Sequence, residues 1–257
     1  MFNRKSLIAV AVVAGSLSFA GAASAQTVIA LSNNSLVMFD AKTQKQKGTV
    51  KINGATVIGI DVRPADGQLY GLTPNGWIVT IDPKTGKTTQ KSELSTKLKS
   101  NTNVSFDFNP AADRLRIVSP DGTSLRVNVD DGKVTVDGNL KFAETDMHKG
   151  EKPNVVAVAY TNSVKGTKET TLYDIDATIG ALLRQAPPND GTLNAVGKLG
   201  IKLNGPVAFN IVPTGEGQNE AWLLNGGTLY KVDLATGKAT PAGKIAGGVS
   251  DIAYLDN

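Results

Sequence analysis

The sequence predicts an all-β protein: a five-bladed β-propeller whose C-terminal strand pairs with the three N-terminal strands to close the ring. Three observations lead to this prediction. Short segments in which small or polar residues alternate with large apolar ones recur at intervals of about 48 residues. Turns rich in Gly, Asn, Asp and Pro separate these segments. One segment of the innermost type is left over at the C-terminus, and the N-terminal repeat lacks one.

The first 25 residues have the three parts of a secretory signal peptide. Asn3–Lys5 is basic, Leu7–Phe19 is apolar, and Ala23–Ala25 is a small-residue cleavage site. The apolar part is too short to cross a hydrocarbon layer of about 30 Å as a helix. We therefore expect residues 1–25 to be removed. Residues 26–257 are then expected to form a single exported β-propeller domain, without a membrane span, in the periplasm or outside the cell.

The innermost strand of each blade is predicted where residues alternate with a period of two. These segments are Gly59–Val62, Ser105–Phe108, Ala157–Tyr160, Ala208–Ile211 and Asp251–Tyr254. An apolar run forms the next strand outward, at Val28–Leu31, Leu69–Leu72, Leu115–Val118, Leu172–Ile175 and Ala221–Leu224.

The third and fourth strands continue each blade outward. The third strands are expected at Leu36–Phe39, Trp77–Ile81, Leu125–Val129, Ala181–Gln185 and Leu229–Val232. The fourth strands are rich in Lys and Thr and are expected at Lys87–Leu94, Lys133–Leu140, Thr192–Leu199 and Lys238–Ile245. Charged and Thr side chains suit an exposed edge that must not recruit other chains.

The turns between third and fourth strands combine Asp or Pro with a final Gly, at Asp82–Gly86, Asp130–Gly132, Pro187–Gly191 and Asp233–Gly237. The Asp side chain accepts hydrogen bonds from amides a residue or two later, and Gly adopts the positive φ that the turn needs. We therefore expect these aspartates to build turns rather than to act in catalysis. A two-sheet sandwich is the alternative arrangement of the same strands.

Several strings resemble a bacterial exported family that is catalogued as a domain of unknown function with a propeller-like repeat. They are Ser105–Pro110 with its Asp-Phe-Asn-Pro core, Asp113–Ser119, Ala159–Asn162 and Pro187–Leu193 with the sequence Pro-Pro-Asn-Asp-Gly-Thr-Leu. The similarity extends over nearly all of residues 26–257. It implies the fold and export, and it brings no catalytic residues.

The composition excludes several classes of function. With no Cys and one His, His148, the chain cannot form disulfides, use a catalytic thiolate or build a zinc site from Cys or paired His. The 27 basic and 23 acidic residues are interspersed and aromatic residues make up 5% of the chain, so nucleic-acid binding is not indicated. No dinucleotide or phosphate-binding fingerprint is present, and no cofactor is expected. His148 follows Glu144 and Asp146 in a predicted loop, where a solvated side chain is the simpler expectation than a metal site.

The candidate ligand-binding residues lie on the predicted inner strands. Asp61, Asp107 and Asn210 occupy equivalent positions, and Asp251 lies two residues earlier in its repeat. Two carboxylates and an amide at the mouth of a central channel can hold a hard cation through oxygen atoms or bind a polar ligand. In the alternative, these side chains bond to backbone amides of the neighbouring blade, because each inner strand leaves one edge unpaired.

A second, weaker candidate is an anion site on the third blade, at Arg114, Arg116 and Arg126. Because these arginines alternate along predicted strands, a solvated face is the alternative. Trp77 and Trp222 lie in predicted strands and are expected in the core.

The function expected from these features is binding. The chain is expected to be a monomeric, non-enzymatic interaction module for a protein or glycan partner that the sequence does not identify. A glycan-active hydrolase that uses Asp61 and Asp107 is an alternative, because glycoside hydrolysis needs two carboxyl groups about 5 to 9.5 Å apart. A structural protein of the cell envelope is a further alternative.

Overall fold

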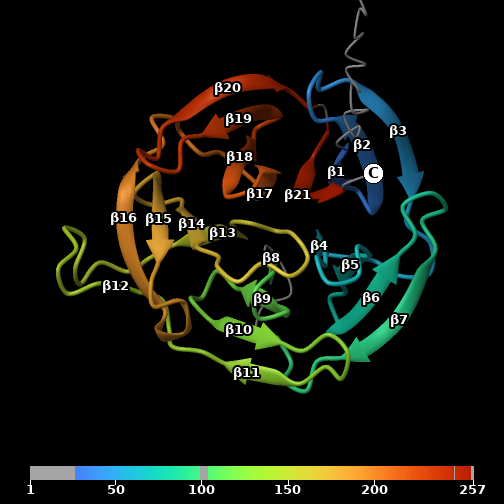
Figure 1. Ribbon diagram of the computed structural model, residues 1–257, viewed down its shortest axis with the longest axis horizontal. Helices are drawn as coiled ribbons and strands as arrows, with labels where there is room; N and C mark the ends of the chain where they lie inside the picture. Colours follow the sequence, from blue (N-terminus) through green and yellow to red (C-terminus); the bar gives the residue numbers. More distant parts are fainter. Residues whose placement is uncertain (1–26, 99–103, 246, 256–257) are drawn as a thin grey trace, which may run out of the picture.

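Five small β-sheets surround a central axis, as Figure 1 shows for this computed structural model, which describes residues 27–98, 104–245 and 247–255. The sheets are the blades of a five-bladed propeller, so the predicted fold class is confirmed. The predicted signal peptide at residues 1–25 lies outside the described residues.

Each blade contains an antiparallel sheet of four strands, which are listed here from the axis outward. Blade 1 consists of β21 (Val249–Leu255), β1 (Thr27–Ser32), β2 (Ser35–Asp40) and β3 (Gln46–Lys51). Blade 2 consists of β4 (Gly59–Val62), β5 (Leu69–Leu72), β6 (Trp77–Ile81) and β7 (Thr88–Glu93). Blade 3 consists of β8 (Ser105–Asn109), β9 (Arg114–Val118), β10 (Ser124–Val127) and β11 (Val134–Val136).

The last two blades follow the same order. Blade 4 consists of β13 (Val155–Tyr160), β14 (Leu172–Asp176), β15 (Ala181–Gln185) and β16 (Thr192–Lys198), with a fifth strand, β12 (Lys141–Phe142), parallel to β16. Blade 5 consists of β17 (Val207–Gly215), β18 (Gln218–Asn225), β19 (Thr228–Val232) and β20 (Ala239–Lys244). A short 3₁₀ helix, η1 (Pro188–Asp190), lies in the turn before β16.

The ring closes where the C-terminal strand joins the N-terminal sheet. β21 pairs antiparallel with β1, with Ala253 opposite Ile29 and Leu255 opposite Thr27. The predicted pairing of the C-terminal strand with the three N-terminal strands is therefore confirmed.

Strand β12 was not expected from the sequence. The predicted outer strand Lys133–Leu140 is shorter in the structure, where β11 ends at Val136. The chain then crosses to blade 4, where the Lys141 amide donates to the Gly191 carbonyl at 2.9 Å. Two residues suffice for this contact, and so short a pairing leaves no alternating pattern in the sequence.

The core consists of layers between blades rather than of one central cluster. On β1, Val28 and Ala30 pack into the layer shared with blade 5. Ile29 and Leu31 pack into the layer shared with blade 2. Because both faces of a blade are covered by neighbours, a second strand such as β1 is buried on both sides, which explains its run of consecutive buried residues.

The outer turns lock neighbouring blades together through glycine. Gly86, Gly132, Gly191 and Gly237 all have positive φ, as the turn prediction requires. Gly86, Gly132 and Gly237 also lie against the backbone of the preceding blade, and Gly191 lies against the connection between β11 and β12. At Gly132 an added Cβ would overlap the Glu93 carbonyl oxygen, and the Ser95 amide donates to the Gly132 carbonyl at 2.9 Å.

Replacing Gly132 with Ala is therefore expected to cost more than backbone strain alone. Gly122 is the matched control: it lies in the same blade and has positive φ, with open space where a Cβ would be. We expect Gly122→Ala to lower the free energy of unfolding by about 1–2 kcal/mol. We expect Gly132→Ala to lower it by at least about 3 kcal/mol, because the blades must also move apart. Equal losses in urea unfolding of the two variants would contradict the proposed inter-blade contact.

Candidate functional site

The acidic side chains predicted at the channel mouth bridge neighbouring inner strands. Asp61 on β4 accepts a hydrogen bond from the Phe108 amide of β8 at 2.8 Å through Oδ2. Asp107 on β8 accepts one from the Tyr160 amide of β13, also at 2.8 Å. The two carboxylates occupy equivalent positions and bind equivalent amides, so one bridge repeats from blade to blade.

A second layer of bridges lies two residues earlier in the repeat, on β21 and β8. Asp251 on β21 accepts from the Ile60 amide at 2.9 Å. Ser105 on β8 accepts from the Val158 amide through Oγ at 2.7 Å. Side chains two residues apart on a strand point to the same face, so both layers of bridges reach toward the same neighbouring blade.

Asn210 on β17 joins the ring from the other side. Its Nδ2 donates to the Ile252 carbonyl at 3.3 Å and to Asp61 Oδ1 at 3.4 Å. Blade 4 contributes Ala157 and Ala159 at the bridging positions of β13, which cannot form such bonds. Asp61 and Asn210, two of the residues expected at the channel mouth, are thus in direct contact.

Burial controls the charge of these carboxyl groups. Loss of solvation raises the pKa of Asp61 to about 7, against the hydrogen bonds from Phe108, Val62 and Asn210 that lower it. Burial also raises the pKa of Asp107 well above its usual range, with repulsion from Asp61 as the second cause. For Asp251, burial again raises the pKa and the hydrogen bond from Ile60 opposes it.

One of these carboxyl groups reaches a cavity. We call it the axial pocket; it has a volume of about 210 Å³ and is lined by Asp61, Val62, Pro64, Gly67, Ser163, Val164, Lys165, Asn210, Ile211, Pro213, Tyr254 and Leu255. In Figure 1 the connection between β13 and β14, which carries Ser163–Lys165, extends over the ring interior toward β4. Among these lining residues Asp61 carries the only carboxyl group; Asp107 and Asp251 do not line the pocket.

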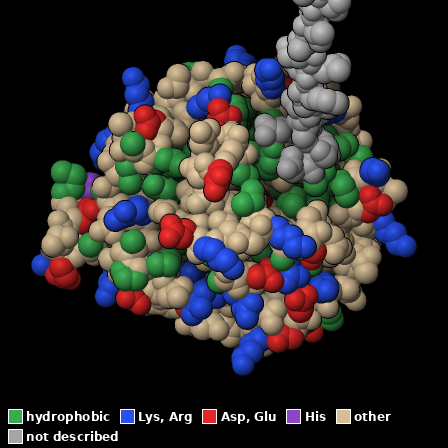
Figure 2. Space-filling view, in the orientation of Figure 1, with side chains coloured by type: hydrophobic (Ala, Val, Ile, Leu, Met, Phe, Trp, Pro, Cys, Tyr) green, Lys and Arg blue, Asp and Glu red, His purple; other side chains and the backbone are tan. Residues whose placement is uncertain are grey.

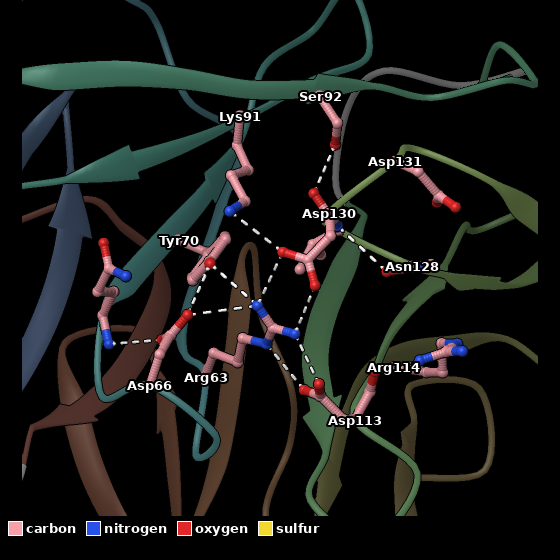
Figure 3. Close-up of polar contacts among 12 residues, drawn as sticks. Arg63, Asp66, Tyr70, Lys91, Ser92, Asp113, Arg114, Asn128, Asp130 and Asp131 are labelled. Atoms are coloured by element: carbon pink, nitrogen blue, oxygen red, sulfur yellow. Dashed lines mark hydrogen bonds and ion pairs between the residues drawn. The ribbon is translucent and has the colours of Figure 1, made fainter.

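The wall of the axial pocket formed by the β4–β5 connection is held by Arg63 (Figure 3). Its guanidinium donates to both carboxylate oxygens of Asp113, at 2.8 and 2.6 Å. It also donates to both oxygens of Asp130, at 3.2 and 2.9 Å. Asp113 and Asp130 belong to blade 3, so this arginine fixes the blade 2 connection against its neighbour.

Within blade 2, Arg63 also contacts Asp66 of the same connection and Tyr70 of β5, each at 3.3 Å. Tyr70 donates its hydroxyl to Asp66 at 2.8 Å, and burial raises the pKa of Tyr70 to about 12. The hydrogen bonds from Arg63 lower the pKa of Asp130. This cluster was not predicted from the sequence; the available signal was that Arg63 stands two residues after Asp61, as Asn109 does after Asp107.

The three arginines predicted as an anion site lie in different surroundings. Arg116 is 1% exposed and donates to Asp137 at 2.6 Å and to Asn189 at 3.0 Å. Arg126 donates to the same carboxylate at 2.8 Å. Arg114 donates to the Asp113 carbonyl at 2.8 Å and does not join them. Arg116 and Arg126 therefore have an acidic partner inside the fold.

His148 packs against the Phe142 ring, with 5.4 Å between ring centroids. Glu151 Oε1 lies 3.2 Å from its Nδ1, outside hydrogen-bonding geometry. Within residues 27–98, 104–245 and 247–255, no three His, Asp or Glu side chains are placed to hold a metal ion.

Charges of both signs alternate on the face seen in Figure 2, and no large patch of one sign stands out there. In the described part of the chain, no helix has the length and hydrophobicity needed to cross a bilayer.

Comparison with known proteins supports the fold and assigns no activity. The family described as "Domain of unknown function (DUF4394)" matches residues 35–253. No curated protein sequence matches the chain. The crystal structure of a protein of unknown function from Bacteroides thetaiotaomicron is similar with a TM-score of 0.52 and 15% identity, over 91% of this chain and 65% of that one. A protein of unknown function from Bacteroides caccae gives a TM-score of 0.44 at 12% identity, over 91% of this chain and 100% of that one.

Asp61, Asp107 and Asp251, which we call the ring acids, are buried and have raised pKa values. These values predict a dependence of stability on pH. Between about pH 4 and pH 7 the folded chain holds protons that the unfolded chain has released, because the pKa of Asp61 rises from 3.8 to about 7. The free energy of unfolding therefore falls as pH increases through this range. The turn acids Asp82 and Asp233 have lowered pKa values, so their contribution to the free energy of unfolding is lost only as pH falls below about 4.

Thermal unfolding measured at pH 5, 6, 7 and 8 checks this expectation. The midpoint is expected to fall by about 5 °C from pH 5 to pH 8, which corresponds to about 2 kcal/mol. Asp61→Asn keeps an acceptor for the Phe108 amide and carries no titrating carboxyl, so its midpoint should vary less with pH. A wild-type midpoint that stays constant or rises over this range would show that the ring acids are ionised in the folded protein.

Proposed function

The chain belongs to the DUF4394 family, a domain of unknown function, and we propose that it is an exported binding module whose ligand occupies the axial pocket. The observation that carries the proposal is the contact of Asp61 and Asn210 at the inner end of a cavity. Both side chains are 7% exposed, and both line that cavity. A pocket with a few convergent polar groups, one of perturbed pKa, is the usual form of a small-molecule site.

The pocket chemistry favours a small ligand that donates hydrogen bonds, and a primary amine above all. Asp61 stands between its neutral and charged forms near pH 7. An ammonium group beside it would favour the carboxylate and lower its pKa. Ser163 supplies a hydroxyl at the rim, and Val164 and Pro213 supply apolar contact surface.

Binding is favoured over hydrolysis because the two predicted catalytic carboxyls do not share the pocket. Hydrolysis of a glycosidic bond needs an acid and a nucleophile or base that both face the substrate. Asp61 lines the axial pocket, whereas Asp107 is 3% exposed and is not among the residues that line it. A structural role in the cell envelope would not require a polar cavity.

Export is supported by the basic, apolar and small-residue pattern of residues 1–25. The binding experiment therefore uses protein from the periplasmic or culture fraction of an expressing bacterium. We expect its mature N-terminus at Gln26.

The proposed function is tested by isothermal titration calorimetry and thermal shift with ethanolamine, glucosamine, glucose and calcium chloride. We expect at least one amine to bind and to raise the unfolding midpoint, and glucose and calcium chloride to bind more weakly. At pH 6 amine binding is expected to release protons, because Asp61 is then largely neutral in the free protein. Proton release is measured as a dependence of the heat on the ionisation enthalpy of the buffer.

Asp107→Asn is the matched control for Asp61→Asn. Both acids accept a hydrogen bond from the next blade, and only Asp61 of the two lines the axial pocket. We expect Asp61→Asn to weaken amine binding at least about tenfold, which corresponds to 1.4 kcal/mol, and Asp107→Asn to change it little. Binding that survives in Asp61→Asn, or no binding by any of the probes, would contradict the proposal.

A further inference from the structure

A second cavity lies at the opposite end of blade 2 from the axial pocket. We call it the Trp77 groove; its volume is about 430 Å³ and it is lined by Gly54, Ala55, Thr56, Thr73, Pro74, Asn75, Trp77, Val79, Thr88 and Gln90. The β4–β5 connection lines the axial pocket, and the turn after β5 lines the groove. Because β5 runs between them, the two cavities open at different ends of the blade.

The groove separates the face of blade 2 from the connection between β3 and β4. Trp77 and Val79 stand on one face of β6, since they are two residues apart. Gln90 on β7 pairs with Val79 and belongs to the same face. The connection supplies the opposite wall through Gly54–Thr56. A gap therefore remains where the blade 1 and blade 2 layer reaches the outside.

The backbone on both sides of the groove is fixed by hydrogen bonds. Asn34 donates to the Ala55 carbonyl at 3.0 Å and accepts from the Val57 amide at 3.0 Å. On the turn side, the Thr73 hydroxyl accepts from the Trp77 amide at 2.8 Å. The walls are thus formed before any ligand arrives, which keeps the entropic cost of binding low.

Several polar groups in the groove have no hydrogen-bond partner among the residues that the structure describes. In the described part of the chain, no hydrogen bond involves the Trp77 indole N–H, the Gln90 amide or the Thr56 hydroxyl. Asn75 uses Oδ1 to accept from Thr73, and its Nδ2 has no bond among the described residues. Both tryptophans were expected in the core. Trp222 lies there and is 3% exposed, whereas Trp77 is only half-buried.

The groove also lacks charge. None of its ten lining residues has an ionisable side chain, although charged residues make up 19% of the chain. A charged ligand would lose its hydration there without gaining a partner of opposite charge. A neutral ligand with both hydroxyl groups and an apolar face fits this lining.

We propose that the Trp77 groove binds a neutral pyranose unit of a glycan. The C–H face of the sugar ring would stack on the indole face, whose π electrons attract the partial positive charge of C–H bonds. The hydroxyl groups at the ring edge would bond to Gln90, Asn75 and Thr56. A proline-rich peptide is disfavoured because such peptides use grooves lined by several aromatic residues, and Trp77 is the only aromatic residue among the ten that line this groove.

Tryptophan fluorescence tests the proposal directly. The probes are maltotetraose, cellotetraose and mannotetraose, with tetragalacturonic acid and a proline decamer as comparisons. We expect at least one neutral tetrasaccharide to shift or quench the emission with a Kd of about 1 mM or lower. Both tryptophans emit, but the change on binding is expected from Trp77, since Trp222 is buried in the core away from the groove.

The variants separate stacking and hydrogen bonding from loss of the fold. Trp77→Ala is expected to abolish binding measured by calorimetry, and Gln90→Ala to weaken it at least fivefold with an unchanged unfolding midpoint. Gln46→Ala replaces an exposed glutamine on another blade and should bind as wild type does. The proposal is overturned if no neutral tetrasaccharide binds or if binding is unchanged in Trp77→Ala and Gln90→Ala. It is also overturned if the acidic sugar or the proline decamer binds in place of the neutral sugars.

Discussion

The inner edge of each blade is the constraint on which the rest of the structure depends. A strand at the axis of a propeller has a neighbouring strand on one side only, so its remaining amides need another acceptor in a place that excludes water. Here side chains of the adjacent inner strand supply it: Asp61 and Asp107 in one layer, and Asp251 and Ser105 in the other. The bridges join consecutive blades and orient them around the axis. Gly132 and its equivalents do the same at the rim through backbone contact.

The same constraint produces the candidate site. Carboxyl groups that serve as acceptors at the axis lose their hydration, and their pKa values rise. Each of these carboxyl groups accepts a hydrogen bond from an amide of the neighbouring inner strand. Asp61 differs from Asp107 and Asp251 because the axial pocket reaches it, together with Asn210, which contacts its second oxygen. A structural bridge and a ligand-binding group can therefore be the same residue, and Arg63 stabilises the wall beside it through two carboxylates of blade 3.

The strand order followed from the sequence because a buried inner strand enforces a period of two. Asp61, Asp107 and Asn210 were identified by that register, and the alternative role considered for them, bonding to neighbouring amides, is the geometry observed for both acids. The sequence could not show which acid reaches a cavity, since that depends on loops such as Ser163–Lys165. Arg63 was missed because its partners lie about 50 and 67 residues away. Trp77 was expected in the core, and the gap left by the β3–β4 connection half-exposes it.

Amide hydrogen exchange followed by NMR tests the central account most directly. The amides of Ile60, Phe108 and Tyr160 face the axis and have a side-chain acceptor in place of a strand partner. These three amides should exchange as slowly as the paired amides of the second strand in each blade, because exchange then requires unfolding of the whole propeller. Exchange of these three amides at the rate of exposed loop amides would mean that the inner edges are open and that the carboxylate bridges do not hold the ring together.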